Sequence, residues 1–176
     1  MKKKVLAVCG STRSNSANLQ ILHYIKELSK IDLEFEIYTD LDKLPHFNPD
    51  LDKDVAPPIV EELRNKIRRA DGVLICTPEY VFSLPGVLKN AIEWCVSATI
   101  FSEKPVALIT ASASGAAAHQ SLQTIMKTIY GDLRPETQLL VQGAKGKIDR
   151  DGNLTDATLA EQLKTLAQAF LHQITY

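Results

Sequence analysis

The segment 10–18 carries a dense group of polar side chains directly after an apolar run. All but one of residues 11–18 have a side-chain hydrogen-bond donor, and Arg13 is the only charged residue among them. A helical apolar pattern follows, so the segment leads into a helix N-terminus, where free backbone N–H groups and the helix dipole attract an anion. One Ser or Asn, such as Ser14 or Ser16, suffices to cap a helix. Because the segment holds six Ser, Thr and Asn residues, it favours a site for a single terminal phosphate group over a simple cap.

Better-known phosphate and nucleophile motifs are absent from this segment. It has no GxGxxG, which argues against a dinucleotide lying across the turn, and no GxxxxGK[ST], which argues against a Walker-type triphosphatase. Arg13 follows Cys9 by four residues, whereas cysteine-dependent phosphatases use a C-x5-R spacing that wraps the phosphate. Cys9 is therefore predicted to lie in the core.

Two further loops follow apolar runs of the sequence. The segment 77–86 contains two prolines that stiffen it, and Tyr80 and Phe82 offer flat apolar surface. A structural turn that caps the next helix explains this segment equally well. The segment 110–116 consists of small residues that let a ligand approach the backbone, and it lacks the GxSxG pattern of a nucleophile elbow. Taken alone, it is explained better as a plain tight turn.

The sequence shows no catalytic triad and no metal-ligand spacing. His46 and His119 share no metal-like spacing with cysteines or carboxylates. The pattern Asp149-x-Asp151-x-Asn153 lacks the Gly and Glu that an EF-hand loop requires, so a turn is predicted there. We therefore predict no catalytic acid, base or nucleophile, and no metal site.

These loops must be positioned by the elements between them, and the apolar pattern alternates between strand-like and helix-like segments. Continuous apolar runs at residues 5–9, 73–76 and 106–109 are typical of parallel strands covered on both faces. Mixed segments at residues 33–38 and 137–141 suit the edges of a sheet. Helices are expected at residues 17–30, 59–69, 87–96, 115–130 and 156–172.

This alternation predicts an α/β fold over one domain, residues 1–176. We expect a doubly wound five-stranded parallel sheet, with the order 2-1-3-4-5 and helices on both faces. The chain then reverses direction between its first and third strands. Ligands bind outside the carboxyl ends of strands at such a point, so the loops at 10–18, 77–86 and 110–116 should flank one crevice.

Composition narrows the classes of partner and compartment. Lys and Arg number 20 and Asp and Glu 21, a net charge of −1 that disfavours binding to nucleic acid or to anionic membranes. No apolar stretch approaches the length of about 18 residues that a membrane-spanning helix needs. Three cysteines inside apolar runs, without CxxC spacing, predict buried reduced thiols and a cytoplasmic protein.

Two long motifs resemble those of a known family. They are Gly10-Ser11-x-Arg13-x-x-Ser16-x-Asn18 and Pro78-Glu79-Tyr80-x-x-Ser83-x-Pro85-Gly86-x-Leu88-Lys89-Asn90-Ala91-Ile92-Glu93-Trp94. Together they resemble the flavodoxin-like NADPH-dependent FMN reductase family, which includes quinone, azo-dye and chromate reductases. The resemblance extends along nearly the whole chain, which makes it far more specific than a lone glycine motif.

The resemblance implies tightly bound FMN, with NADPH or NADH as co-substrate. It implies that the FMN phosphate is held by Ser11, Arg13, Ser16 and Asn18. It further implies that Pro78, Glu79, Tyr80 and Val81 lie against the isoalloxazine ring, largely through backbone groups, and that Ser112 and Ser114 lie near the flavin. Residues 88–94 match the family's interface helix, which implies a homodimer or homotetramer.

The implied activity is FMN-dependent NAD(P)H oxidoreduction by a ping-pong route, with a quinone, azo compound or free flavin as acceptor. The sequence departs from the family at Val81, where Asn is usual, at the bulky Phe82, and at Ala117-Ala118, where a Gly-Gly pair is common. Two alternatives stay open. A flavodoxin-type electron carrier would need the acidic face that a charge of −1 does not supply, and a flavin-free interaction domain would leave the donor-rich segment 11–18 unexplained.

Overall fold

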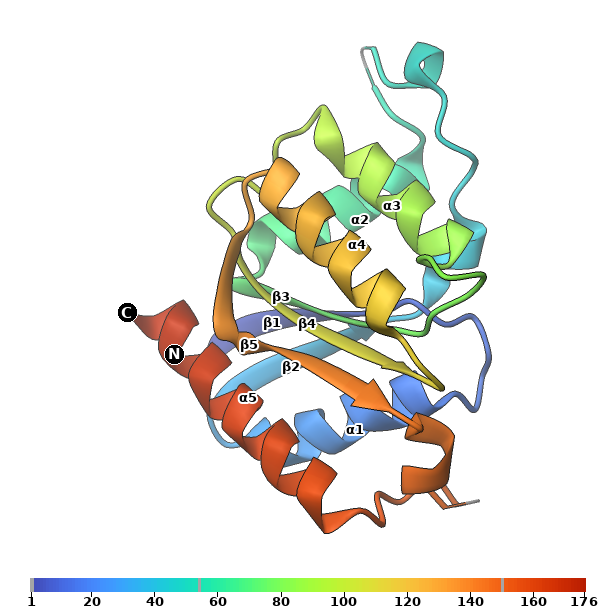
Figure 1. Ribbon diagram of the computed structural model, residues 1–176. Coiled ribbons are helices and arrows are strands. Elements are labelled where there is room, and N and C mark those ends of the chain that lie inside the picture. Colours follow the sequence, from blue (N-terminus) through green and yellow to red (C-terminus); the bar gives the residue numbers. More distant parts are fainter. Residues whose placement is uncertain (1, 54, 150) are drawn as a thin grey trace.

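The alternating apolar segments form five strands of one parallel sheet, in the order β2-β1-β3-β4-β5 (Figure 1). The computed structural model describes residues 2–53, 55–149 and 151–176. The strands are β1 (Lys3–Cys9), β2 (Leu33–Tyr38), β3 (Gly72–Thr77), β4 (Pro105–Ser112) and β5 (Asp132–Gln142). The doubly wound topology predicted from the apolar pattern is confirmed, with the mixed strands β2 and β5 at the edges, and so is the flavodoxin-like fold that the resemblance implies.

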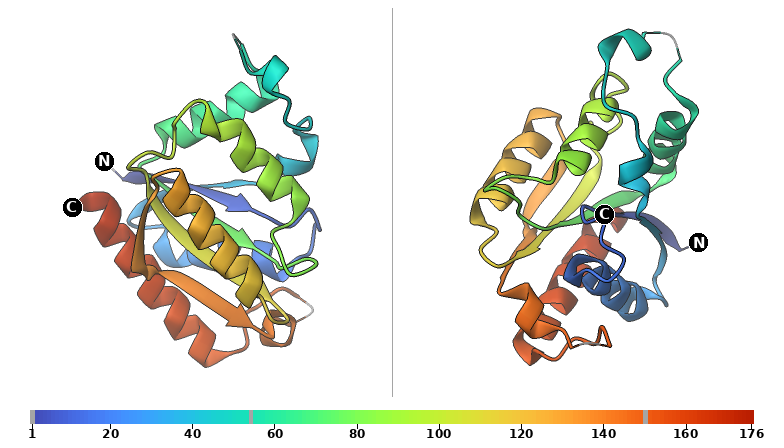
Figure 2. Two further views of the ribbon diagram at one scale, coloured as in Figure 1. Left: turned by 45° about the horizontal axis from the view of Figure 1, so that its top comes forward. Right: turned by 90° about the vertical axis from the view of Figure 1, so that its right-hand side faces the viewer.

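Helices cover both faces of this sheet, as predicted. Helices α1 (Ala17–Ser29) and α5 (Ala157–Thr175) lie on one face, and α2 (Pro58–Arg69), α3 (Gly86–Val96) and α4 (Ala116–Thr128) lie on the other (Figure 2). Short 3-10 helices are η1 (Asp40–Lys43), η2 (Pro49–Leu51) and η3 (Ala144–Lys147). Two helical layers with a sheet between them give the chain two apolar interfaces.

Successive side chains of each central strand enter these two interfaces in turn. On β1, Val5 and Ala7 pack with α1 and α5, whereas Leu6 and Val8 pack with α2 and α3. All six residues of β3 are buried. Because burying one Val, Leu or Ile side chain stabilises a fold by about 1.5–3 kcal/mol, the central strands hold the sheet, and with it the loops that follow the strands, in fixed positions.

The three cysteines, Cys9, Cys76 and Cys95, are buried free thiols, as predicted from their apolar surroundings. Burial raises the pKa of the Cys95 thiol to about 12. These thiols therefore stay protonated and serve as small core residues.

Strand β5 is longer than the predicted 137–141. It begins at Asp132, and its register against β4 shifts between Val106 and Leu108. The irregular part contains Arg134, Pro135 and Glu136, all exposed. These residues interrupt the apolar pattern, which hid the first half of the strand.

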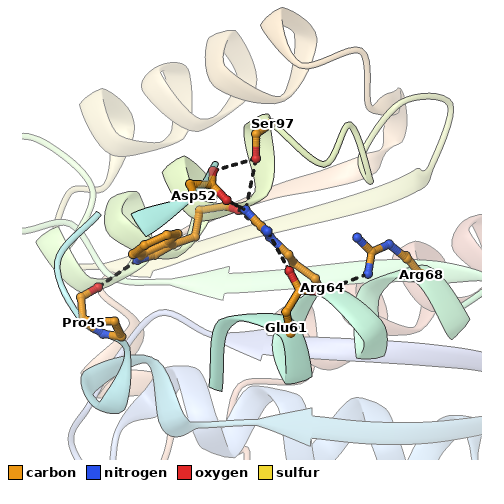
Figure 3. A network of polar contacts seen from close by, with 7 residues as sticks. Pro45, Asp52, Glu61, Arg64, Arg68 and Ser97 are labelled. Carbon is orange, nitrogen blue, oxygen red and sulfur yellow. Dashed lines mark hydrogen bonds and ion pairs between the residues drawn. The ribbon is translucent and has the colours of Figure 1, made fainter. Parts of the chain in front are cut away.

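The segment after β2 is predicted as a long loop, and polar side chains of α2 and α3 hold it in place (Figure 3). Arg64 is buried and pairs with Asp52 at 2.6 Å and with Glu61 at 2.7 Å. Its Nε donates to the Trp94 carbonyl at 2.8 Å, and Ser97 donates to the Asp52 carboxylate at 2.6 Å. One buried guanidinium therefore joins α2, α3 and the loop.

The beginning of the same loop is attached to α3 by two side chains. Trp94 Nε1 and Asn90 Nδ2 both donate to the Pro45 carbonyl, at 2.8 and 2.9 Å. Asn90 Oδ1 accepts the Phe47 N–H at 2.7 Å, and the Phe47 ring meets the Trp94 ring edge-on. The loop is thus an ordered part of the α3 side of the molecule.

Candidate functional site: a crevice at the carboxyl edge of the sheet

All five strands point to one edge of the sheet, where the loops that follow them meet (Figure 1). A cavity of about 620 Å³ opens there, lined by residues that follow β1, β3, β4 and β5. That volume lies within the range of about 300–1,000 Å³ for small-molecule sites. The structure therefore brings the three predicted loops together around one crevice.

Close packing of β1 against β3 brings the first two loops together. The Gly10 N–H donates to the Cys76 carbonyl at 2.8 Å. A Cβ atom at Gly10 would lie 2.3 Å from Thr77 Oγ1, so no larger residue fits without displacing β3. The glycine is needed for this close approach.

The first loop ends at the N-terminus of α1, and Ser16 caps that helix. Ser16 Oγ accepts the Leu19 N–H at 3.2 Å. The N–H groups of Ala17 and Asn18, in the first turn, have no acceptor among the described residues. Free N–H groups at a helix N-terminus form an anion site.

Arg13 adds a positive charge to this end of the crevice. Its side chain lines the cavity, is exposed, and makes no ion pair with the residues that the structure describes. Ser11, also at the cavity wall, is buried, and its hydroxyl accepts the Arg13 N–H at 3.4 Å. Ser11 thus shapes the loop that carries the guanidinium.

Asn18 also lines the cavity, but unlike Arg13 it is buried and its side chain bonds to the fold. Its Nδ2 donates to the Ala111 carbonyl at 3.2 Å, and its Oδ1 accepts from Cys76 Sγ at 3.4 Å. The amide therefore ties the start of α1 to β3 and β4. The sequence motif marks the residue but not this direction of its side chain.

In the second loop, Pro78 and Tyr80 line the cavity, whereas the side chain of Glu79 does not. Glu79 Oε2 accepts the Ala118 N–H at 3.0 Å, in the first turn of α4. A carboxylate at a helix N-terminus is stabilised by the dipole. Glu79 therefore anchors the loop to α4 and leaves only its backbone for a ligand.

The tip of this loop is a tight turn closed by two hydrogen bonds. The N–H of Tyr80 donates to the Ser83 carbonyl and that of Ser83 to the Tyr80 carbonyl, both at 3.0 Å. Val81 and Phe82, at its centre, have φ angles of 51° and 54°. Their side chains are 96% and 80% exposed and stand outside the cavity lining. Val81, which the resemblance places against the flavin ring, therefore directs its side chain into solvent.

In the third loop, Ser112 lines the cavity, and Ser114 is exposed beyond it. Gly115 caps α4 with a φ of 87°, a backbone conformation that favours glycine. His119 lies behind this loop, where its Nδ1 is 2.9 Å from Thr110 Oγ1. Burial lowers the pKa of His119, so its ring is neutral near pH 7.

The residues after β5 form a fourth wall that sequence reasoning missed. Gly143 donates its N–H to the Ala113 carbonyl at 3.2 Å, which joins this segment to the third loop. Lys145 lines the cavity, is exposed, and forms no ion pair within the described part of the chain. The predicted strand order contains a signal for this wall, because it makes the segment after β5 leave the carboxyl edge of the sheet beside the loop after β4.

Asp149, at the end of that wall, sits in the turn that the sequence predicted. Its carboxylate accepts the N–H groups of Asp151 and Asn153 at 2.9 and 2.8 Å. Hydrogen bonds from Asn153 are the largest cause that lowers the pKa of Asp149. The carboxylate is thus occupied by its own turn.

No group of three or more His, Cys, Asp and Glu side chains among the described residues is arranged to hold a metal ion. None of the helices in the described ranges has the length and apolar character needed to cross a membrane.

Comparison with known proteins gives consistent matches along the chain. The sequence model of the NADPH-dependent FMN reductase family matches residues 3–145. A 2-hydroxy-1,4-benzoquinone reductase of a Burkholderia species is 32% identical over 97% of this chain and 95% of its own length. An NAD(P)H:quinone oxidoreductase of Solanum tuberosum is 33% identical over 94% of this chain and 90% of its own.

Solved structures agree with these sequence matches. The flavoenzyme NAD(P)H:(acceptor) oxidoreductase FerB from Paracoccus denitrificans superimposes with a TM-score of 0.86, at 31% identity, over 98% of this chain and 97% of that one. The azoreductase AzrA, at 17% identity and a TM-score of 0.64, shares the fold.

Proposed function

The chain belongs to the NADPH-dependent FMN reductase family, and from this premise we propose that it binds FMN tightly in the carboxyl-edge crevice and acts as an NAD(P)H oxidoreductase. The observation that carries the proposal is a single cavity with an anion site at one end and a rigid, mostly apolar wall at the other. Such a cavity suits a ligand with one phosphate and a flat ring. We take residues 1–176 as one FMN-binding domain.

The phosphate of FMN fits the N-terminus of α1. Donors and positive charge are supplied there by the N–H groups of residues 17 and 18 and by the guanidinium of Arg13, which have no partners among the described residues. Ser11 and Ser16 hold the loop and the helix start in shape, and Asn18 fixes the helix start to the sheet. Phosphate binding thus uses residues already held in place by the fold.

The flavin ring fits between the second and third loops. Pro78 and Tyr80 form one wall, and Ala111, Ser112 and Ala113 form a wall of small residues. The N–H groups of residues 79, 81 and 113 have no acceptor among the described residues. Such groups stabilise negative charge on a bound ring. Glu79 and the loop prolines keep this wall rigid.

When bound, FMN would supply the redox chemistry, which is hydride transfer from NAD(P)H and electron transfer to an acceptor. The chain's own residues would then need only to bind and orient the ligands and to stabilise charge. We propose a quinone, an azo compound or a free flavin as the acceptor. The names of the benzoquinone and quinone reductases among the relatives support the first of these.

We further propose a cytoplasmic homodimer or homotetramer. Buried free thiols favour a reducing compartment. On the expected interface helix α3, Leu88, Ile92 and Trp94 are buried against the sheet, so a partner would meet its outer face instead. Val96 and Leu51 are both 50% exposed. Each precedes in sequence a residue of the hydrogen-bonded pair Ser97 and Asp52. These two apolar side chains support a subunit contact at this end of α3.

The test is the visible absorption of the purified protein, followed by addition of NADPH without oxygen. We expect flavin absorption that bleaches rapidly, and steady-state kinetics with parallel double-reciprocal lines. Flavin that stays yellow with both NADPH and NADH would favour the electron-carrier alternative. A colourless protein that takes up no added FMN would refute the proposal.

A further inference from the structure

The turn at residues 80–83 exposes apolar side chains in an unusual way. Tyr80, Val81 and Phe82 are consecutive, and their exposed fractions are 48%, 96% and 80%. Isolated exposed apolar residues are common on protein surfaces, but a contiguous group at a binding site is typical of a contact surface. Nothing within the described chain packs on Phe82 or Val81 closely enough to bury either side chain.

The backbone of this turn is also strained. Its φ angles of 51° at Val81 and 54° at Phe82, with the paired hydrogen bonds of Tyr80 and Ser83, are those of a type I′ turn. That turn favours Asn-Gly, and a β-branched residue such as Val is an outlier in this backbone region. The sequence therefore breaks a local rule here, and neither side chain is buried by the described residues in return. Such departures concentrate at functional sites.

The position of the turn indicates what the exposed ring contacts. Tyr80 lines the crevice, so the turn stands at the rim of the same cavity. Its place is fixed, because Glu79 is bonded to α4 and Tyr80 to Ser83. The charged side chains that line the cavity, Arg13, Lys145 and Asp149, belong to the walls built by the loops after β1 and β5. Hence, among the described residues, the loop at 77–86 adds an aromatic side chain to the cavity lining and no charged one.

We propose that Phe82 is a specificity-determining residue, which forms an outer aromatic wall against the electron acceptor. This inference rests on the proposed function, in which the flavin fills the crevice and the acceptor arrives at its open side. An aromatic ring carried at the rim by this hydrogen-bonded turn gains most from a flat, uncharged acceptor, on which it can stack. A highly charged acceptor without an apolar face gains nothing from it. The turn thus favours flat uncharged acceptors such as quinones over charged ones.

The test compares Phe82→Asn with the unchanged protein, both loaded with FMN. Asn suits a left-handed backbone, so the turn is kept while the ring is removed. We expect the dissociation constant of 1,4-naphthoquinone for the oxidised protein, measured by calorimetry, to rise about tenfold. The ratio of kcat/KM for 1,4-naphthoquinone to kcat/KM for ferricyanide should fall by a similar factor. Phe82→Tyr, which keeps an aromatic ring, should have the same dissociation constant and kcat/KM ratio as the unchanged protein.

Tyr130 provides a matched control within the chain. It is an aromatic residue, 76% exposed, with a φ of 60°, and it lies between α4 and β5 at the opposite edge of the sheet. Tyr130→Asn therefore makes the same chemical and backbone change away from the crevice. We expect it to leave the naphthoquinone dissociation constant and the kcat/KM ratio at their original values.

Several results would overturn the inference. One is an unchanged naphthoquinone dissociation constant in Phe82→Asn, and another is an equal effect of Tyr130→Asn. A parallel loss with both acceptors would place Phe82 against the flavin or NAD(P)H, and a changed oligomeric state with unchanged quinone affinity would place it in a subunit contact. If NADPH fails to bleach the unchanged protein, the proposed function fails, yet the dissociation constant still decides whether Phe82 contacts the quinone.

Discussion

At the residue scale, Arg13 is the side chain on which phosphate recognition depends most directly. It is exposed in the crevice beside the free N–H groups of α1 and has no ion-pair partner in the described part of the chain. A charge-assisted hydrogen bond contributes about 1.5–3 kcal/mol. We therefore expect Arg13→Ala to weaken FMN binding by about 10- to 100-fold, as measured by fluorescence titration of the apoprotein. Arg134→Ala, an exposed arginine on β5, should have no effect, and an equal loss in both variants would contradict the assignment.

Val81 gives a second prediction at this scale, which concerns stability. A non-glycine residue in left-handed backbone costs about 1–2 kcal/mol, and Val81 gains no burial in return. Val81→Asn should raise the free energy of unfolding by about 1 kcal/mol and Tm by about 2–4 °C. Thermal unfolding followed by circular dichroism checks this. A lower Tm would show that the valine is stabilised by a contact absent from this structure.

The sequence motif predicts which residues surround the crevice, but it does not predict where their side chains point. The motif marked Ser11, Arg13, Ser16, Asn18 and Pro78 through Val81, and all of them lie on the loops that surround the crevice or, for Asn18, in the first turn of α1. It gave no side-chain directions: Asn18 is turned into the core, Glu79 toward α4, and Val81 into solvent. Those directions depend on groups distant in sequence, such as the Ala111 carbonyl and the Ala118 N–H, whose approach follows from the packed fold.

At the element scale, the buried guanidinium of Arg64 joins α2, α3 and the loop after β2 (Figure 3). Its side chain and that of Asp52 are each only 6% exposed. Removing one partner of a buried ion pair costs about 3–5 kcal/mol, because the other charge stays buried. Arg64→Leu should lower the free energy of unfolding in urea by that amount. Arg68→Leu, whose side chain is 44% exposed at 3.6 Å from Glu61, should cost less than about 1 kcal/mol. Equal effects of the two substitutions would contradict the structural role assigned to Arg64.

The same cluster makes stability depend on pH. Burial alone raises the pKa of Asp52, but hydrogen bonds from Ser97 and Arg64 outweigh it and hold the pKa below its ordinary value of 3.8. A carboxyl whose pKa is depressed by folding contributes stability above its unfolded pKa, and loses it as pH falls through the folded value. The stability advantage of the unchanged protein over Asp52→Asn should therefore be full at neutral pH and shrink below about pH 4. An advantage that persists at pH 2 would contradict this assignment.

Strands with long uninterrupted apolar runs were easier to predict from the sequence than strands whose apolar pattern is interrupted. The buried runs of β1, β3 and β4 set the sheet order, because only central parallel strands are apolar on both faces. The first half of β5 was missed, since Arg134-Pro135-Glu136 breaks the pattern at a register shift. The loop after β2 gave no sign of order, because its anchors Arg64, Asn90 and Trp94 come from later helices.

At the scale of the whole molecule, parallel strands carry every predicted loop to one edge of the sheet. The rule that ligands bind at carboxyl ends of strands located the crevice from sequence. It also applies to the segment after β5, where Lys145 and Asp149 complete the wall. That segment contains no motif, so only its position in the folded chain reveals it.

The central claim is that this crevice holds FMN with its phosphate at the N-terminus of α1. The most direct measurement is the ratio of the dissociation constants of riboflavin and FMN for the apoprotein, because the two ligands share the ring and differ in the phosphate. Two or more charge-assisted hydrogen bonds predict that FMN binds at least about 100-fold more tightly. Equal affinities for the two flavins would show that the phosphate makes no contact at α1, and would contradict the account.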